Sequence, residues 1–195
     1  MLRINATYQL PFSRNEFVHG WRLTGIWSQN TGAPDTINDG FSRSGIGSNQ
    51  PSADRPNLAS GCSQNPIVNR PLANGILWFD PTCFVLLPAG TLGTVGRTTV
   101  TGPPFKGMNF GLLKDTRLPK VSELFTVQFR AEVANLFNHP SLALNQTGGG
   151  QPNQIFTNGN VNADGSVGTR NPNAGIITGQ IGSGRTITLA LKATF

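Results

Sequence analysis

Apolar and polar residues alternate along several stretches of the chain, most clearly in residues 124–136. There the odd positions from 125 to 133 carry Phe, Val, Phe, Ala and Val, and the even positions from 126 to 132 carry Thr, Gln, Arg and Glu. Successive side chains of a β-strand point to opposite faces, so this period of two predicts an amphipathic strand. Almost no stretch has the period of 3.6 residues that is typical of a helix. The pattern therefore predicts an all-β protein.

The same alternation predicts five strands, near residues 2–10, 20–29, 108–118, 124–136 and 184–195. Their connections alternate in length. A short link joins the first strand to the second and the third to the fourth, whereas residues 30–107 and 137–182 form two long connections. Short periplasmic turns and long extracellular loops are typical of outer-membrane barrels. We therefore expect antiparallel transmembrane β-barrel strands, a partial barrel of about five strands, with long extracellular loops.

The two long connections are rich in turn-forming residues. The chain has 24 Gly and 14 Pro, and many of them lie with Asn and Asp in these two segments. Such residues favour turns because they adopt positive φ or fix φ. The composition therefore predicts loops rather than a packed core. Within the second loop, Asn158-Gly159 is a candidate turn for a small hairpin.

Aromatic residues and charges are placed as a barrel requires. Trp21, Phe125 and Phe195 lie near one end of the predicted strands and Phe137 lies near the other, where aromatic girdles form. The polar side chains predicted to face the lumen are Arg22, Gln128, Arg130 and Glu132. The charged ones could pair with one another or with a plug, or could simply hydrate the interior.

A soluble β-sandwich is the main alternative, because alternation alone also suits sandwich strands. The unequal loops, the strand length and the aromatic placement favour the membrane barrel. The chain has no run of about 18 apolar residues, so the sequence predicts no membrane-spanning helix. The N-terminus carries no signal-peptide pattern. Since five strands also leave two unpaired edges, we expect the chain to be the C-terminal part of a longer barrel protein.

Composition and motifs supply little chemistry. The net charge is +6, but the basic residues are scattered, so nucleic-acid binding is not expected. Cys62 and Cys83 share one long loop and predict a disulfide. His19 and His139 are solitary turn or loop residues, and a faint calcium-loop pattern around Asp164 has too few carboxylates. We expect no catalytic residues, no metal, no cofactor and no enzymatic activity.

The block "QFRAEVANLFNHP" within residues 124–144 is the most specific motif of the chain, and the segment 90–118 accompanies it. Weaker blocks are "DRPNL", "WFDPTCF" and the closing "LALKATF". Together these blocks resemble the C-terminal part of the Oar-like TonB-dependent outer-membrane receptors of acidobacteria. The resemblance implies a barrel of about 22 strands around an N-terminal plug. The plug and the signal peptide are not within these 195 residues.

The resemblance also implies the role and the partners of the whole protein. We expect an outer-membrane receptor or transporter that binds and imports, or exports, a ligand. The expected partners are outer-membrane lipid, the rest of the barrel and its plug, the inner-membrane TonB system and the outer-membrane assembly machinery. Phe195 would be the C-terminal signal that this machinery recognises. The alternative function is a secreted or surface-attached β-sandwich adhesin without a pore.

Overall fold

The chain is all-β throughout the part that the structure describes. The computed structural model describes residues 1–12, 18–45, 54–119, 124–144, 151–163 and 165–195. These residues contain one short 3₁₀ turn, η1 (Pro81–Cys83), and no α-helix. None of their helical segments is long and apolar enough to cross a bilayer. They divide into two compact units.

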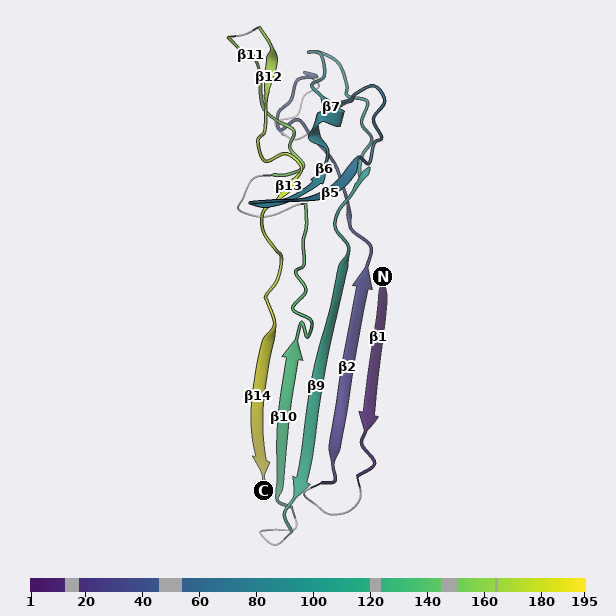
Figure 1. Cartoon of the computed structure of the whole chain (residues 1–195), viewed down its shortest axis with the longest axis vertical. Helices are drawn as coiled ribbons and strands as arrows, with labels where there is room; N and C mark the ends of the chain where they lie inside the picture. The colour runs from purple at the N-terminus through teal and green to yellow at the C-terminus, as the bar shows by residue number, and fades with distance from the viewer. Residues whose placement is uncertain (13–17, 46–53, 120–123, 145–150, 164) are drawn as a thin grey trace. The chain divides into compact units, whose positions relative to one another are not determined.

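The first unit, which we call the strand unit, comprises Met1–Thr31, Phe105–Ser141 and Gly182–Phe195. Its described residues form one five-stranded sheet of β1 (Leu2–Gln9), β2 (Trp21–Asn30), β9 (Phe105–Arg117), β10 (Thr126–Ala134) and β14 (Thr186–Thr194). The order is β1-β2-β9-β10-β14, and Figure 1 shows the five strands side by side. All neighbours are antiparallel. Each strand overlaps its predicted range, and the all-β antiparallel class is confirmed.

The register shows how the connections leave the sheet. Asn30 at the end of β2 pairs with Phe105 at the start of β9, and Ala134 at the end of β10 pairs with Thr186 at the start of β14. Both long connections therefore start and finish at one end of the sheet. The short links lie at the opposite end. Within the described residues, β1 and β14 each pair on one side only, so the sheet is open.

The second unit, the insert unit, comprises Gly32–Pro104 and Leu142–Ile181. Its strands are β3 (Pro34–Asp35), β4 (Asn57–Leu58), β5 (Ile67–Leu72), β6 (Gly75–Phe79), β7 (Phe84–Val85), β8 (Val100–Thr101), β11 (Phe156–Val161), β12 (Val167–Arg170) and β13 (Ile176–Ile177). They form one three-stranded sheet, β13-β6-β5, and three two-stranded pairs. The β13–β6 pair joins the two long connections, which are far apart in sequence.

The insert unit has a hydrophobic core, which corrects the prediction that the long connections are loops without one. Phe79 and Phe84 are fully buried, with ring centroids 5.7 Å apart and planes at 84°. Ile155 and Ile177, from the other connection, are buried in the same cluster. The apolar residues are thinly spaced among Gly and Pro, so neither connection alone shows a core pattern. Only their combination encloses these side chains.

The hairpin of the second connection turns at a different place from the one predicted. Asn158 and Gly159 lie inside β11, and the turn to β12 is closed by the hydrogen bond from the Asn162 main-chain N–H to the Ser166 carbonyl, 2.7 Å. Gly165 in this turn has a φ of +77°, a conformation that glycine adopts without strain. The turn therefore includes a glycine at the position where its backbone has a positive φ. Asp164 itself lies outside the described residues.

The core of the insert unit yields a testable stability prediction. We expect Phe79→Ala to destabilise this unit by about 3–5 kcal/mol, because it removes a buried ring and leaves a cavity. Limited proteolysis of the whole protein in increasing denaturant measures the effect, with cut sites mapped by mass spectrometry. Val68→Ala is the control, since Val68 is 43% exposed. Equal protease resistance of the two variants would contradict the packing described here.

Candidate functional site

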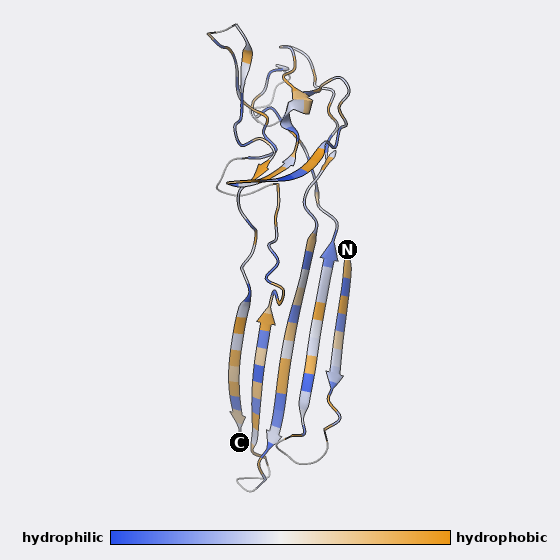
Figure 2. Ribbon diagram, in the orientation of Figure 1, coloured by the Kyte–Doolittle hydropathy of each residue, from blue (hydrophilic) through white to orange (hydrophobic). Residues whose placement is uncertain are grey.

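The pairing register divides the five-stranded sheet into two chemically different faces. Residues directly opposite one another in an antiparallel pair lie on the same face. Ile4 pairs with Trp27 and Trp27 with Met108, so all three share a face, and the same rule extends across β10 and β14. Figure 2 shows the resulting alternation of apolar and polar positions along the strands.

The apolar face is continuous across all five strands. Its apolar and glycine positions are Leu2, Ile4, Ala6, Tyr8, Trp21, Leu23, Gly25, Trp27, Met108, Phe110, Leu112, Val127, Phe129, Ala131, Val133, Ile187, Leu189, Leu191 and Ala193. Much of it is uncovered: Leu191 is 74% exposed, Leu189 67% and Ile4 53%. Apolar patches of this extent mark a surface that contacts another protein or a membrane.

Lys106 and Lys114 are the charged exceptions within the apolar face. Lys106 pairs with Gln29 at the end with the long connections. Lys114 pairs with Trp21 on one side and Phe129 on the other. Its side chain is mostly covered: Nζ donates to the His19 carbonyl at 2.6 Å and lies 5.5 Å from the centre of the Trp21 ring. The aliphatic stem thus runs along apolar surface while the ammonium reaches the end of the sheet with the short links. The strict period of two along residues 108–114 would have revealed this placement.

The polar face carries the four residues predicted to line a lumen. Its polar side chains are Arg3, Asn5, Thr7, Gln9, Arg22, Thr24, Ser28, Asn30, Asn109, Asp115, Arg117, Thr126, Gln128, Arg130, Glu132, Thr186, Thr188, Lys192 and Thr194. The few apolar side chains among them include Ile26 and Leu113. The two faces therefore differ in nearly every row of the sheet.

Polar contacts link neighbouring strands on this face. Arg22 Nη2 lies 3.8 Å from Asp115 Oδ2, and Gln128 Nε2 donates to Asp115 Oδ1 at 2.8 Å. Arg130 Nε lies 3.1 Å from Glu132 Oε1 within β10. All four charged partners are about a third to a half exposed, so each ion pair adds little stability.

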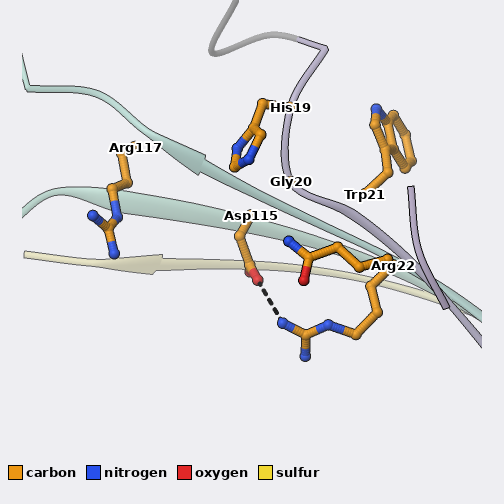
Figure 3. Close-up of a pocket in the computed structure, with 7 residues that line it drawn as sticks. His19, Gly20, Trp21, Arg22, Asp115 and Arg117 are labelled. Atoms are coloured by element: carbon orange, nitrogen blue, oxygen red, sulfur yellow. Dashed lines mark ion pairs between the residues drawn. The ribbon is translucent and has the colours of Figure 1, made fainter. Parts of the chain in front are cut away.

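Two shallow hollows lie on the strand unit. The larger, about 320 Å³, lies at the end with the short links and is lined by Gln9, His19, Gly20, Trp21, Arg22, Asp115 and Arg117. Figure 3 shows the Asp115 carboxylate paired with Arg22, with His19 and Arg117 on its other side. The second hollow, about 250 Å³, includes Thr24, Gly111 and Glu132 in its lining.

Aromatic residues mark both ends of the sheet. Trp21 opens β2, Phe125 directly precedes β10 and Phe195 directly follows β14, all at the end with the short links. Phe137 follows β10 at the other end, where its ring and that of Trp27 make a T-shaped contact with centroids 6.4 Å apart and planes at 70°. Phe195 is 93% exposed. These positions bracket the apolar face.

The structure shows where the two cysteines and the two histidines named in the sequence analysis lie. Cys62 and Cys83 are joined by a disulfide in the insert unit, with Cα atoms 5.5 Å apart. His19 and His139 lie outside the strands, and the His139 main-chain N–H donates to Asn135 Oδ1 at 2.9 Å. In the described parts of the chain, no group of three or more His, Cys, Asp or Glu side chains is arranged to hold a metal ion.

The insert unit contains a pair of buried carboxylates that the sequence did not reveal. Asp54 accepts hydrogen bonds from the Ser44 main-chain N–H at 2.7 Å, from Ser44 Oγ at 2.8 Å and from the Arg43 main-chain N–H. Burial raises the pKa of Asp54, but these hydrogen bonds outweigh it and hold the pKa below its usual value. Asp39 is fully buried, and neither of its carboxyl oxygens has a hydrogen-bond partner among the residues that the structure describes.

The two carboxyl groups influence each other. Burial and, to a smaller extent, the negative charge of Asp54 raise the pKa of Asp39 to about 7, and the nearby Arg43 guanidinium opposes both effects. In the sequence, Asp39 stands in "INDG" and looked like an ordinary turn residue. No local pattern could have indicated its burial, because this segment pairs with residues distant in sequence: the Asn38 main-chain N–H donates to the Asn153 carbonyl at 3.0 Å and that of Asp39 to the Asp54 carbonyl at 3.1 Å.

Comparison with known proteins identifies one family. The family model described as "Outer membrane beta barrel domain" matches residues 1–188. No curated protein and no solved structure matches the chain.

Proposed function

Because the chain belongs to the outer membrane beta barrel domain family, we propose that its sheet is part of the wall of a TonB-dependent, Oar-like transporter. Membership of that family places the protein in the outer membrane, in contact with outer-membrane lipid. The receptor type, the transport of a ligand and the TonB system as energy source are the proposal.

The main support for this proposal is that apolar and polar side chains stay on opposite faces across all five paired strands. A sheet in a bilayer must present apolar side chains to hydrocarbon, since a midplane Arg on the lipid face costs roughly 2–4 kcal/mol. The apolar face presents apolar side chains in every strand. Of its two lysines, Lys106 lies at the end with the long connections and Lys114 directs its ammonium towards the other end. The polar face suits a water-filled or plugged interior.

Strand length agrees with the same assignment. At about 3.3 Å per residue and a tilt of about 40°, the nine residues of β10 rise roughly 23 Å and the thirteen of β9 roughly 33 Å. An outer-membrane apolar band is about 25 Å tall. Trp21 and Phe195 at one end and Phe137 at the other then lie near the interfaces, where aromatic rings are favoured.

The receptor type rests on the resemblance of residues 124–144 and on the unequal connections. We propose that the insert unit faces the outside, that β1 and β14 pair with further strands of a closed barrel, and that a plug fills its lumen. Unpaired strand edges are costly in lipid, which supports closure. In this account Phe195 is the residue that the assembly machinery recognises, and the protein has no catalytic activity.

A β-sandwich adhesin remains the alternative from another class. In a sandwich a second sheet covers the apolar face. The described residues of the strand unit form a single sheet, and its apolar face is left open. Family membership also favours the barrel.

Arginine substitutions on the two faces test the barrel assignment. We expect Leu112→Arg, on the apolar face, to destabilise the folded protein by roughly 2–4 kcal/mol, because the charge enters hydrocarbon. Thr24→Arg is the matched control: it lies on the polar face beside a hollow that Glu132 also lines, so it should cost little. Urea unfolding in lipid vesicles measures both. Equal destabilisation would contradict a lipid-facing apolar surface.

Cysteine labelling in cells tests the receptor type separately. In the full-length protein, we expect Gln128→Cys to react with a membrane-impermeant maleimide faster when the TonB system is active, because plug movement exposes the lumen. Val161→Cys is the control, since Val161 in the insert unit is 70% exposed. Identical rates at position 128 with and without TonB would contradict TonB dependence. They would leave the barrel assignment intact.

A further inference from the structure

The polar face of the strand unit carries an excess of positive charge. Its charged side chains in the described strands are Arg3, Arg22, Asp115, Arg117, Arg130, Glu132 and Lys192, a net charge of 5 − 2 = +3. Asp115 and Glu132 each lie beside one arginine, at 3.8 Å and 3.1 Å. The excess is therefore due to the three basic side chains outside these two ion pairs.

Two of these three cations lie at the end of the sheet with the short links. Arg117 is the last residue of β9 and pairs with Thr126, and Lys192 lies one row further in, opposite Gln128. Arg3, near the start of β1, lies at the other end. The charged residues of the two short links are Arg14, Glu16, Lys120 and Glu123, whose formal charges cancel. The excess charge thus belongs to the wall of the sheet.

The hollow at this end places hydrogen-bond donors around one space. Arg22 and Arg117 line it together with His19 and Gln9, and its volume is about 320 Å³. Figure 3 shows Arg22 and Arg117 on either side of Asp115. The charge of Asp115 is offset, since Asp115 lies beside Arg22 and accepts from Gln128 Nε2 at 2.8 Å. A guanidinium presents a rigid fork of N–H donors that matches a carboxylate or a phosphate.

We propose that this hollow binds an anionic solute through a phosphate or carboxylate group. Arg22 and Arg117 supply the guanidinium donors, and Lys192 adds a flanking positive charge. The inference rests on the proposed function, in which the polar face lines the interior of a barrel, and it names the class of solute. It needs no TonB system, because it concerns binding and not transport.

The position of the cations favours a solute over a lipid headgroup. Arg22, Arg117 and Lys192 all lie on the polar face, whereas lipid contacts the apolar face. On the apolar face Lys114 is the lysine near this end, and its ammonium already donates to the His19 carbonyl at 2.6 Å. The hollow lies at the lower end of the volume range of small-molecule sites, so it suits the anionic group of a solute.

Equilibrium dialysis of the full-length protein in an uncharged detergent, with radiolabelled inorganic phosphate as the probe, tests the site. At an ionic strength of about 0.01 M, where screening is weak, we expect saturable binding. Arg117→Gln and Lys192→Gln should each weaken it roughly 3- to 6-fold, the factor for one unit charge about 4–6 Å away in water. Asp115→Asn should strengthen it by a similar factor, because it removes a negative charge and its amide oxygen can still accept from Gln128.

Arg3→Gln is the matched control, since Arg3 is exposed on the same face at the opposite end. It removes the same charge and should leave phosphate affinity unchanged. Absence of saturable binding to the wild type would overturn the proposal, as would equal weakening by Arg3→Gln or displacement of phosphate by phosphatidylglycerol, which would indicate a headgroup site. If Arg117→Gln does not fold, Lys192→Gln and Asp115→Asn decide. None of these results bears on the maleimide test of TonB dependence, so the two proposals can fail separately.

Discussion

The strand unit depends on one constraint, the antiparallel register that keeps each row of side chains on a single face. A slip of one residue in any pair would move a whole strand's apolar side chains to the polar face. The pairing of Val133 with Phe110 and with Ile187 illustrates the rule, because three strands contribute apolar side chains to one row. In a bilayer such rows face hydrocarbon, and the ladder pairs the main-chain groups that lipid cannot hydrate.

The same constraint explains where charged side chains occur close to apolar ones in the sheet. Lys114 is tolerated on the apolar face because its ammonium reaches the His19 carbonyl and the Trp21 ring at the end of the sheet. Arg22 lies next to Trp21 in sequence but on the other face, where Asp115 is its partner. Whether the sheet tolerates a charged side chain therefore depends on the face on which the residue lies and on how near the residue is to the end of its strand.

The strands were predictable from sequence because their signal is local. Residues 124–136 and 184–195 show the period of two without any knowledge of their partners, and β10 and β14 form there. The insert unit was not predictable in this way. Phe79 and Ile177 belong to different connections and meet only in the folded core, and Asp39 owes its burial to distant segments. The turn near Gly165 was misplaced because Asn158-Gly159 is the stronger local turn sequence.

The family assignment and the two-faced sheet make one central claim, that the odd-numbered residues of β10 face lipid and the even-numbered ones face an aqueous interior. Nitroxide scanning of residues 126–134 in outer-membrane vesicles tests it most directly. Oxygen should reach the labels at 127, 129, 131 and 133, and a water-soluble nickel complex should reach those at 126, 128, 130 and 132, which gives two opposite periods of two. Accessibility to the nickel complex at all of these positions, or no alternation, would contradict the account.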